Sequence, residues 1–152
     1  MNYFTLLWLS VMAFSCCPQR TLTNPSPEQG ITGFIREVKG NRMPSPGAVL
    51  PEPKGIKTTL YIFEETNLSQ VDRKENEPLY RNIRARLVKT VESDESGRFT
   101  VSLPPGRYSL FTKVNEMYFA NRFDEKNNIH PVVVEKDKLT EADFLVDIDA
   151  VY

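Results

Sequence analysis

The side chains that most often carry chemistry are scarce in this chain of 152 residues. It has one histidine, His130, and two adjacent cysteines, Cys16 and Cys17. A Ser–His–Asp triad would have to recruit His130, which we expect to be a solvated loop residue just before a strand. One histidine is too few for a multi-histidine metal centre, and two cysteines are too few for a four-cysteine zinc site.

Carboxylates are numerous but do not form a metal-binding pattern. Asp147 and Asp149 lie two residues apart on a predicted strand and point to the same face, while Asp94 and Glu95 lie in a predicted turn. None belongs to a dense Asp/Asn/Gly calcium loop, so we expect a polar outer face and neither metal nor cofactor. Nineteen Lys and Arg against twenty Asp and Glu give a net charge of −1. Such a chain lacks the basic field that nucleic-acid binding requires.

Binding chemistry is more plausible near residue 120. Tyr118, Phe119, Asn121, Arg122 and Phe123 place aromatic, amide and cationic groups in one short stretch. Exposed aromatic rings beside amides suit sugar stacking or a protein-binding hot spot, which makes Tyr118, Phe119 and Asn121 candidate binding residues. In the alternative, Tyr118 and Phe119 belong to the core and Asn121 caps a turn.

A second candidate binding segment follows the first predicted strand. Asn41 and Met43 lie in a loop rich in glycine and proline (residues 40–47). Met43 either packs back onto the domain or forms an exposed contact, and the sequence leaves both open.

The body of the chain reads as β-strands, because apolar and polar residues alternate with a period of two and the helical period is nearly absent. About seven strands are expected, with turn signals between them, which favours an antiparallel sandwich. The polar run 64–78 is predicted to be a surface loop, a short helix or a partly disordered excursion, and residues 140–143 one helical turn. The expected strands are 31–38, 60–63, 85–91, 99–103, 108–113, 131–135 and 144–149.

Two turns carry the most specific structural signals. Gly97 follows an acidic pair between two strand patterns, which predicts a tight hairpin with a positive φ at this glycine. In Leu103-Pro104-Pro105-Gly106-Arg107-Tyr108, Pro105 presets φ and Gly106 is expected in the left-handed region. The same segment resembles a tyrosine corner, in which the Tyr108 hydroxyl bonds backbone near Pro104.

The segment 93–108 (SDESGRFTVSLPPGRY) resembles the signature of carboxypeptidase regulatory-like domains. The match places Gly97 and Phe99 at a hairpin and Pro105, Gly106 and Tyr108 at the corner. Looser similarities at 31–35, 40–47 and 118–121 extend it over about residues 30–150, and the last two are similar to motifs of small Bacteroidota envelope proteins. The resemblance implies a seven-stranded Greek-key β-sandwich of the transthyretin-like class in an extracytoplasmic setting. It does not imply peptidase activity.

The N-terminal residues have the pattern of a targeting segment. An apolar run over residues 3–14 is too short to cross a bilayer as a helix but suits the apolar region of a signal peptide. Ser15 and Cys16 after it resemble a bacterial lipobox, which implies cleavage before Cys16 and a lipid on its thiol. A plain secretory signal and an N-terminal strand are the alternatives, and Cys17 is a second possible lipid site.

These observations predict three parts: a signal peptide (1–15), a lipidated N-terminus with a flexible proline-containing tether (16–29), and the sandwich domain (30–152). The leading functional hypothesis is a non-catalytic, membrane-anchored accessory or adaptor module of the bacterial cell envelope. The expected location is the outer membrane, on its periplasmic side, and the expected partner an envelope protein or a glycan. A surface lipoprotein that binds carbohydrate or peptide is the alternative, and a small hydrolase a remote one.

Overall fold

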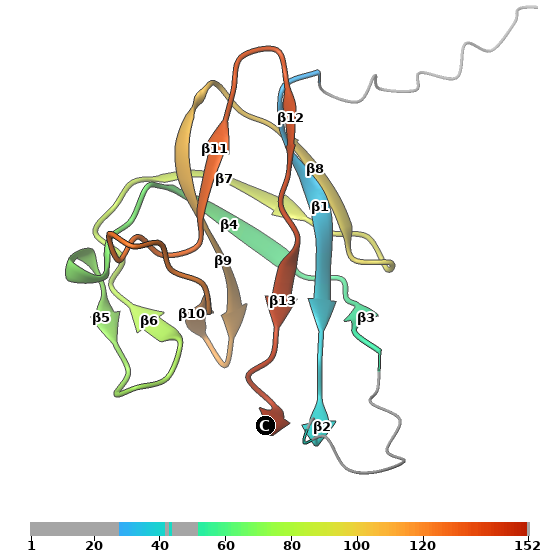
Figure 1. The fold of residues 1–152 in the computed structure, drawn as a ribbon, viewed down its shortest axis with the longest axis vertical. Coiled ribbons are helices and arrows are strands. Elements are labelled where there is room, and N and C mark those ends of the chain that lie inside the picture. Colours follow the sequence, from blue (N-terminus) through green and yellow to red (C-terminus); the bar gives the residue numbers. More distant parts are fainter. Residues whose placement is uncertain (1–27, 42, 44–51, 152) are drawn as a thin grey trace, which may run out of the picture.

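The computed structural model describes residues 28–41, 43 and 52–151 (Figure 1), so the signal peptide, Cys16 and Cys17 lie outside it. The described residues form short β-strands and one 3-10 helix, η1, and contain no α-helix. The elements are β1 Gly30–Glu37, β2 Gly40–Asn41, β3 Lys54–Gly55, β4 Thr59–Glu64, η1 Leu68–Gln70, β5 Asp72–Arg73, β6 Leu79–Arg81, β7 Leu87–Glu92, β8 Arg98–Ser102, β9 Gly106–Val114, β10 Met117–Phe119, β11 Pro131–Val134, β12 Leu139–Glu141, β13 Phe144–Val146 and β14 Ala150–Val151.

The strands form two larger sheets, as the alternating pattern predicts, but the expectation of a wholly antiparallel sandwich is wrong, because β1 has two parallel neighbours. In the five-stranded sheet, β1 lies between β12 and β13, which run parallel to it, and β8 and β3, which run antiparallel. The seven-stranded sheet has the order β5-β6-β10-β9-β4-β7, and β11 pairs with the beginning of β9. A small parallel pair, β2 with β14, completes the set.

One hydrophobic core joins the two sheets. It receives Ile31 and Ile35 from β1, Leu60 and Ile62 from β4, and Phe144 from β13, all with almost no exposed surface. Each such side chain contributes roughly 1.5–3 kcal/mol of burial free energy. The architecture is therefore all-β and sandwich-like.

Each of the seven predicted strand segments contains an observed strand: β1, β4, β7, β8, β9, β11 and β13. Seven further strands of two or three residues come in addition. The helical turn predicted at 140–143 is wrong, because β12 extends through Glu141 and the Ala142 amide donates to Thr32 O at 2.9 Å. In the polar run 64–78, η1 is capped by Asn67, whose side chain accepts from the Ser69 amide, and β5 follows.

The tight turn and the positive φ predicted at Gly97 are confirmed, but the turn does not close a β-hairpin, because β7 pairs with β4 of the seven-stranded sheet and β8 pairs with β1 of the five-stranded sheet. Gly97 has φ +82°, and the Asp94 carboxylate accepts hydrogen bonds from the amides of Ser96 (2.9 Å) and Arg98 (3.0 Å). A Cβ at Gly97 would lie 2.1 Å from the backbone oxygen of Ile35, so glycine is required for space as well as for conformation. Phe99, next on β8, is buried in the core as predicted.

The tyrosine corner is also confirmed, because the Tyr108 hydroxyl donates to Pro104 O at 2.9 Å. Pro105 forms the exposed bend before β9. The left-handed conformation expected at Gly106 is wrong, since its φ is not positive. Gly106 instead leaves room for the Tyr108 ring, because a Cβ there would lie 3.2 Å from the Tyr108 hydroxyl.

Candidate functional site

Tyr118 and Phe119 point to opposite sides of β10. Phe119 is fully buried and its ring packs on Phe144 of the other sheet, with centroids 6.2 Å apart. The hypothesis that Phe119 is an exposed ligand contact is therefore wrong, and the alternative, a core residue, holds. Tyr118 is half-buried on the other face, edge-to-face with Tyr61 at 5.3 Å, and Lys113 Nζ lies 5.2 Å from the Tyr118 ring centroid.

Asn121 lies at the border of an open hollow of about 500 Å³ that Phe123 also lines. Its Nδ2 donates to Asp147 Oδ1 at 2.7 Å, and its buried Oδ1 has no hydrogen-bond partner. Phe123 is 40% exposed. An amide, a carboxylate and an aromatic ring are thus brought together on the surface, although Tyr118 and Phe119 do not line this hollow.

Asn41 and Met43 belong to the second candidate binding segment, residues 40–47. Asn41 is the last residue of β2 and pairs in register with Val151 of β14. Met43 is 49% exposed, which favours the alternative of a surface contact over packing back onto the sandwich. The rest of the loop falls outside the described residues.

The expectation that His130 is solvated is wrong. Only 3% of its surface is exposed, and its ring stacks on Phe144 with centroids 4.6 Å apart and an interplanar angle of 20°. Burial, with a smaller effect from the positive charge of Arg122, lowers the pKa of His130 from 6.5 to about 4. The imidazole is therefore neutral at pH 7, and its Nδ1 has no hydrogen-bond partner.

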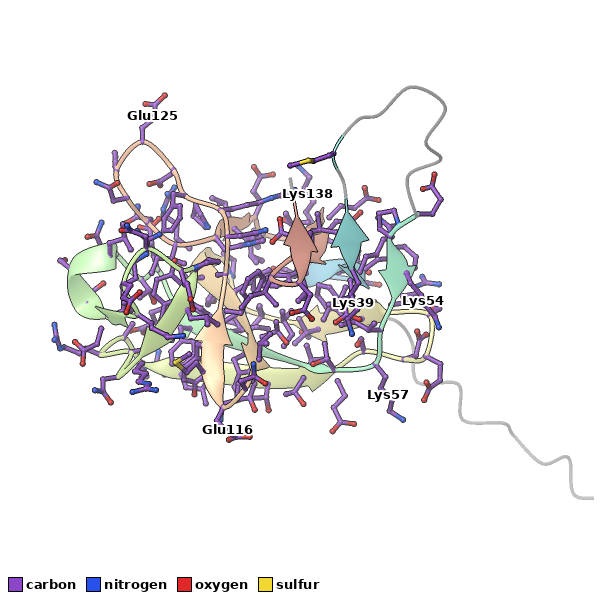
Figure 2. The ribbon with its side chains drawn as sticks, turned by 90° about the horizontal axis from the view of Figure 1, so that it is seen from below. Lys39, Lys54, Lys57, Glu116, Glu125 and Lys138 are labelled. Carbon is purple, nitrogen blue, oxygen red and sulfur yellow. The ribbon has the colours of Figure 1, made fainter. Side chains whose placement is uncertain are left out.

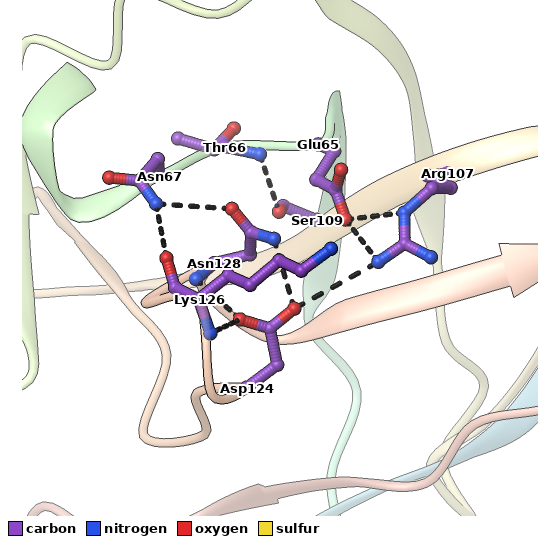
Figure 3. Close-up of polar contacts among 8 residues, drawn as sticks. All are labelled: Glu65, Thr66, Asn67, Arg107, Ser109, Asp124, Lys126 and Asn128. Carbon is purple, nitrogen blue, oxygen red and sulfur yellow. Dashed lines mark hydrogen bonds and ion pairs between the residues drawn. The ribbon is translucent and has the colours of Figure 1, made fainter.

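Residues 121–130 form a loop that hydrogen bonds hold in one conformation, and Figure 3 shows its centre. Asp124 Oδ1 accepts from the amides of Lys126 (2.9 Å) and Asn128 (2.8 Å), and Asp124 Oδ2 accepts from Asn128 Nδ2 (2.9 Å). These bonds, led by the Asn128 amide, lower the pKa of Asp124. Figure 2 shows Glu125 at the outer tip of this loop.

The same network ties the loop to the seven-stranded sheet. Asn67 Nδ2 donates to Lys126 O at 2.7 Å, and the Thr66 amide donates to Ser109 Oγ of β9 at 2.9 Å (Figure 3). Arg107, also on β9, forms an ion pair with Glu65 and lies 3.9 Å from Asp124. The loop therefore presents its exposed side chains from a fixed backbone.

A second hollow, of about 410 Å³, opens beside this loop between β11 and residues 140–143. We call it the β11–β12 hollow. Phe123 and Val133, which are 40% and 43% exposed, both line it, as do Arg122, Glu141 and the buried His130. Sequence reasoning missed Val133 and Glu141, because each lies on a different strand and only the fold brings them together.

Within the described part of the chain, no three His, Cys, Asp or Glu side chains gather closely enough to hold a metal ion. In the same residues, no helix has the length and apolar character needed to cross a bilayer. In comparisons with protein families, curated proteins and solved structures, nothing matched this chain. The functional argument therefore depends on its own residues.

Proposed function

We propose that the chain is a non-catalytic adaptor module of the bacterial cell envelope that contacts a partner protein through β7. The observation that carries this proposal is the exposed edge of the seven-stranded sheet. β7 ends that sheet, and β4 is its only strand partner among the described residues. Four of its six residues are exposed, including Leu87 at 45%. An edge strand offers unpaired backbone groups to another chain.

Two features of β7 favour a selective contact over indiscriminate pairing. The register against β4 shifts between Ile62 and Phe63, which marks an irregularity at the start of β7. Lys89 lies on the strand, and its Nζ donates to Ser102 O at 3.2 Å. Irregular pairing and lysine are common protections of natural sheet edges. A partner must therefore fit this edge in shape and charge.

The proposal includes the finer fold assignment, a seven-stranded Greek-key sandwich of the transthyretin-like class. It is supported by the Tyr108 hydroxyl bonded to Pro104 O, by the positive φ at Gly97 and by the pairing of β8 with β1. Together with the resemblance of the segment 93–108, these features favour a carboxypeptidase regulatory-like domain. Such a domain is named for its place beside a catalytic domain, so the resemblance does not imply peptidase activity.

The proposal places the domain on the periplasmic side of the outer membrane, held by a lipid on Cys16 and the tether 16–29. Two or more acyl chains make such anchoring stable, at roughly 0.8 kcal/mol for each buried CH₂. Metabolic labelling with a lipid precursor should mark the wild-type chain and the Cys17→Ala variant but not Cys16→Ala. Labelling that survives Cys16→Ala would reject this anchor.

Crosslinking tests the adaptor role. A photo-reactive amino acid replaces Leu87 in the full chain, and the matched control replaces exposed Lys74, which follows β5 at the opposite edge of the sheet. After irradiation of intact cells, position 87 should give one discrete protein adduct that position 74 lacks. Equal adducts at both positions, or none at 87, would contradict the proposal.

A carbohydrate-binding surface protein is the second candidate, and the hollow beside Asn121 favours it. Sugar sites combine an exposed ring with planar polar groups, as Phe123, Asn121 and Asp147 do here. The test is a panel of cell-wall and host glycans offered to the purified chain. Binding that Asn121→Ala abolishes would support this candidate, and binding that it leaves unchanged would exclude this hollow.

A further inference from the structure

The β11–β12 hollow lies where the two sheets separate. β11 pairs with β9 of the seven-stranded sheet, whereas β12, which follows it, pairs with β1 of the other sheet. Figure 1 shows β11 and β12 side by side below the turn that connects them. From β12 the chain continues to β13. Thr140 Oγ1 donates to Val133 O at 2.8 Å and bridges the two strands. The hollow therefore lies where the chain passes from one sheet to the other.

Half of its lining residues are aliphatic or aromatic. Pro131, Val132, Val133 and Ala142 line it together with Phe123. A single exposed apolar side chain is ordinary on a protein surface. Here, however, two of the four large apolar side chains found exposed among the described residues border one hollow (Met43 and Leu87 are the other two). Such a wall suits an apolar side chain of a ligand.

Charged groups of opposite sign complete the lining. Arg122 and Glu141 both line the hollow, and neither forms an ion pair with another described residue. The neighbouring Asp143, in contrast, is already used, because it accepts from Arg36 Nη1 at 3.0 Å and from the Phe34 amide at 2.9 Å. Arg122 is thus available to an acidic group, and Glu141 to a basic group.

His130 contributes a rigid part of the wall. It lines the hollow, it is almost fully buried, and its Nδ1 has no hydrogen-bond partner and almost no accessible surface. His130 therefore shapes the hollow and does not offer this atom to a ligand. Stacking on Phe144 and the hydrogen-bonded loop 121–130 hold this wall in place before a ligand arrives.

We propose that the β11–β12 hollow binds an extended peptide segment of a partner protein. An apolar side chain of the peptide packs between Phe123 and Val133, an acidic residue pairs with Arg122, and a basic residue pairs with Glu141. The inference rests on the proposed adaptor function and adds a second contact surface, separated from β7 by β4 and β9 in the sheet. A neutral sugar would leave both charges and the aliphatic wall unused.

The test uses the purified full chain and fluorescein-labelled peptides of the sequence Asp-Thr-Leu-Thr-Lys and its reverse, measured by fluorescence anisotropy. At least one of them should bind, and serine in place of leucine should weaken it at least tenfold. Val133→Arg should weaken binding at least tenfold, whereas Asn76→Arg, at an exposed position in the turn between β5 and β6 and outside both the hollow and β7, should change it less than twofold.

A charge-swap variant distinguishes loss of binding from loss of folding. Arg122→Glu should weaken binding of the original peptide at least tenfold and bind a peptide with lysine in place of aspartate better than the wild type does. No binding of either peptide at 1 mM, or binding that Val133→Arg and Arg122→Glu leave unchanged, overturns the inference. If the peptide binds as expected but the crosslinking experiment gives no adduct at position 87, the β7 contact is rejected and the peptide site in the hollow is not.

Discussion

Because His130 is buried, the folded protein should lose stability as the pH falls. Replacing this histidine should remove that loss. His130 has a pKa of about 4 in the folded chain, because it is buried against Phe144 and close to Arg122. An unfolded chain has a histidine pKa near 6.5. Well above pH 6.5 the imidazole is neutral in both states, so it does not change the free energy of unfolding. As the pH falls from 6.5 to 4, only the unfolded state gains a proton, so the folded state loses stability.

The size of the effect follows from the difference between the two pKa values. Each unit corresponds to about 1.4 kcal/mol, so the histidine removes about 2 kcal/mol by pH 5 and about 3 kcal/mol once the pH is below 4. His130→Phe keeps an aromatic ring on Phe144 and cannot titrate. Because residue 130 has φ +39°, the variant can differ from the wild type at pH 7.5. The measured quantity is therefore the loss between pH 7.5 and pH 5.

Two assays check this prediction. Urea denaturation followed by circular dichroism should show that His130→Phe loses about 2 kcal/mol less than the wild type between pH 7.5 and pH 5. Since the chain has one histidine, its single imidazole resonance can also be followed by NMR, and its midpoint should lie well below 6.5. Equal losses in both proteins, or a midpoint near 6.5, would refute the burial argument.

Three further predictions concern turns and the fixed loop. Tyr108→Phe should lower the free energy of unfolding by about 1–2 kcal/mol, because the corner carbonyl loses its donor, while Tyr61→Phe on the half-buried outer face should cost less than half as much by urea denaturation. Gly97→Ala should cost at least 2 kcal/mol more than Gly40→Ala, since both have a positive φ but only Gly97 lacks room for a Cβ; a thermal melt showing equal losses would contradict this. Asp124→Ala should speed hydrogen exchange of the amides at 126 and 128 without changing exchange in β9, and unchanged exchange at these two amides would count against the network.

The longer strands are predictable because alternation and turn residues are local properties of the sequence. β4 is an example, since Leu60 and Ile62 face the core while Tyr61 and Phe63 face the other side of the same sheet. The two- and three-residue strands are not predictable this way. β12, for instance, exists because Leu139–Glu141 pairs with β1, more than a hundred residues earlier in the chain.

The candidate site was predictable only in part, for a related reason. The stretch 118–123 contains the right residue types, but the register of β10 against β9 decides that Phe119 faces the core and Tyr118 the opposite face. The polar residues around His130 favour a solvated loop, whereas the fold brings Phe144 against its ring. Such outcomes depend on contacts between distant segments, which no local pattern records.

The proposed adaptor role depends on β7 being covered by another chain. The most direct measurement is hydrogen exchange across residues 87–92, comparing the full chain in native membrane vesicles with the same chain purified in detergent. We expect slower exchange of these amides in the vesicles and little change in β9 at the centre of the sheet. Equal exchange of 87–92 in both preparations would contradict a partner on this edge.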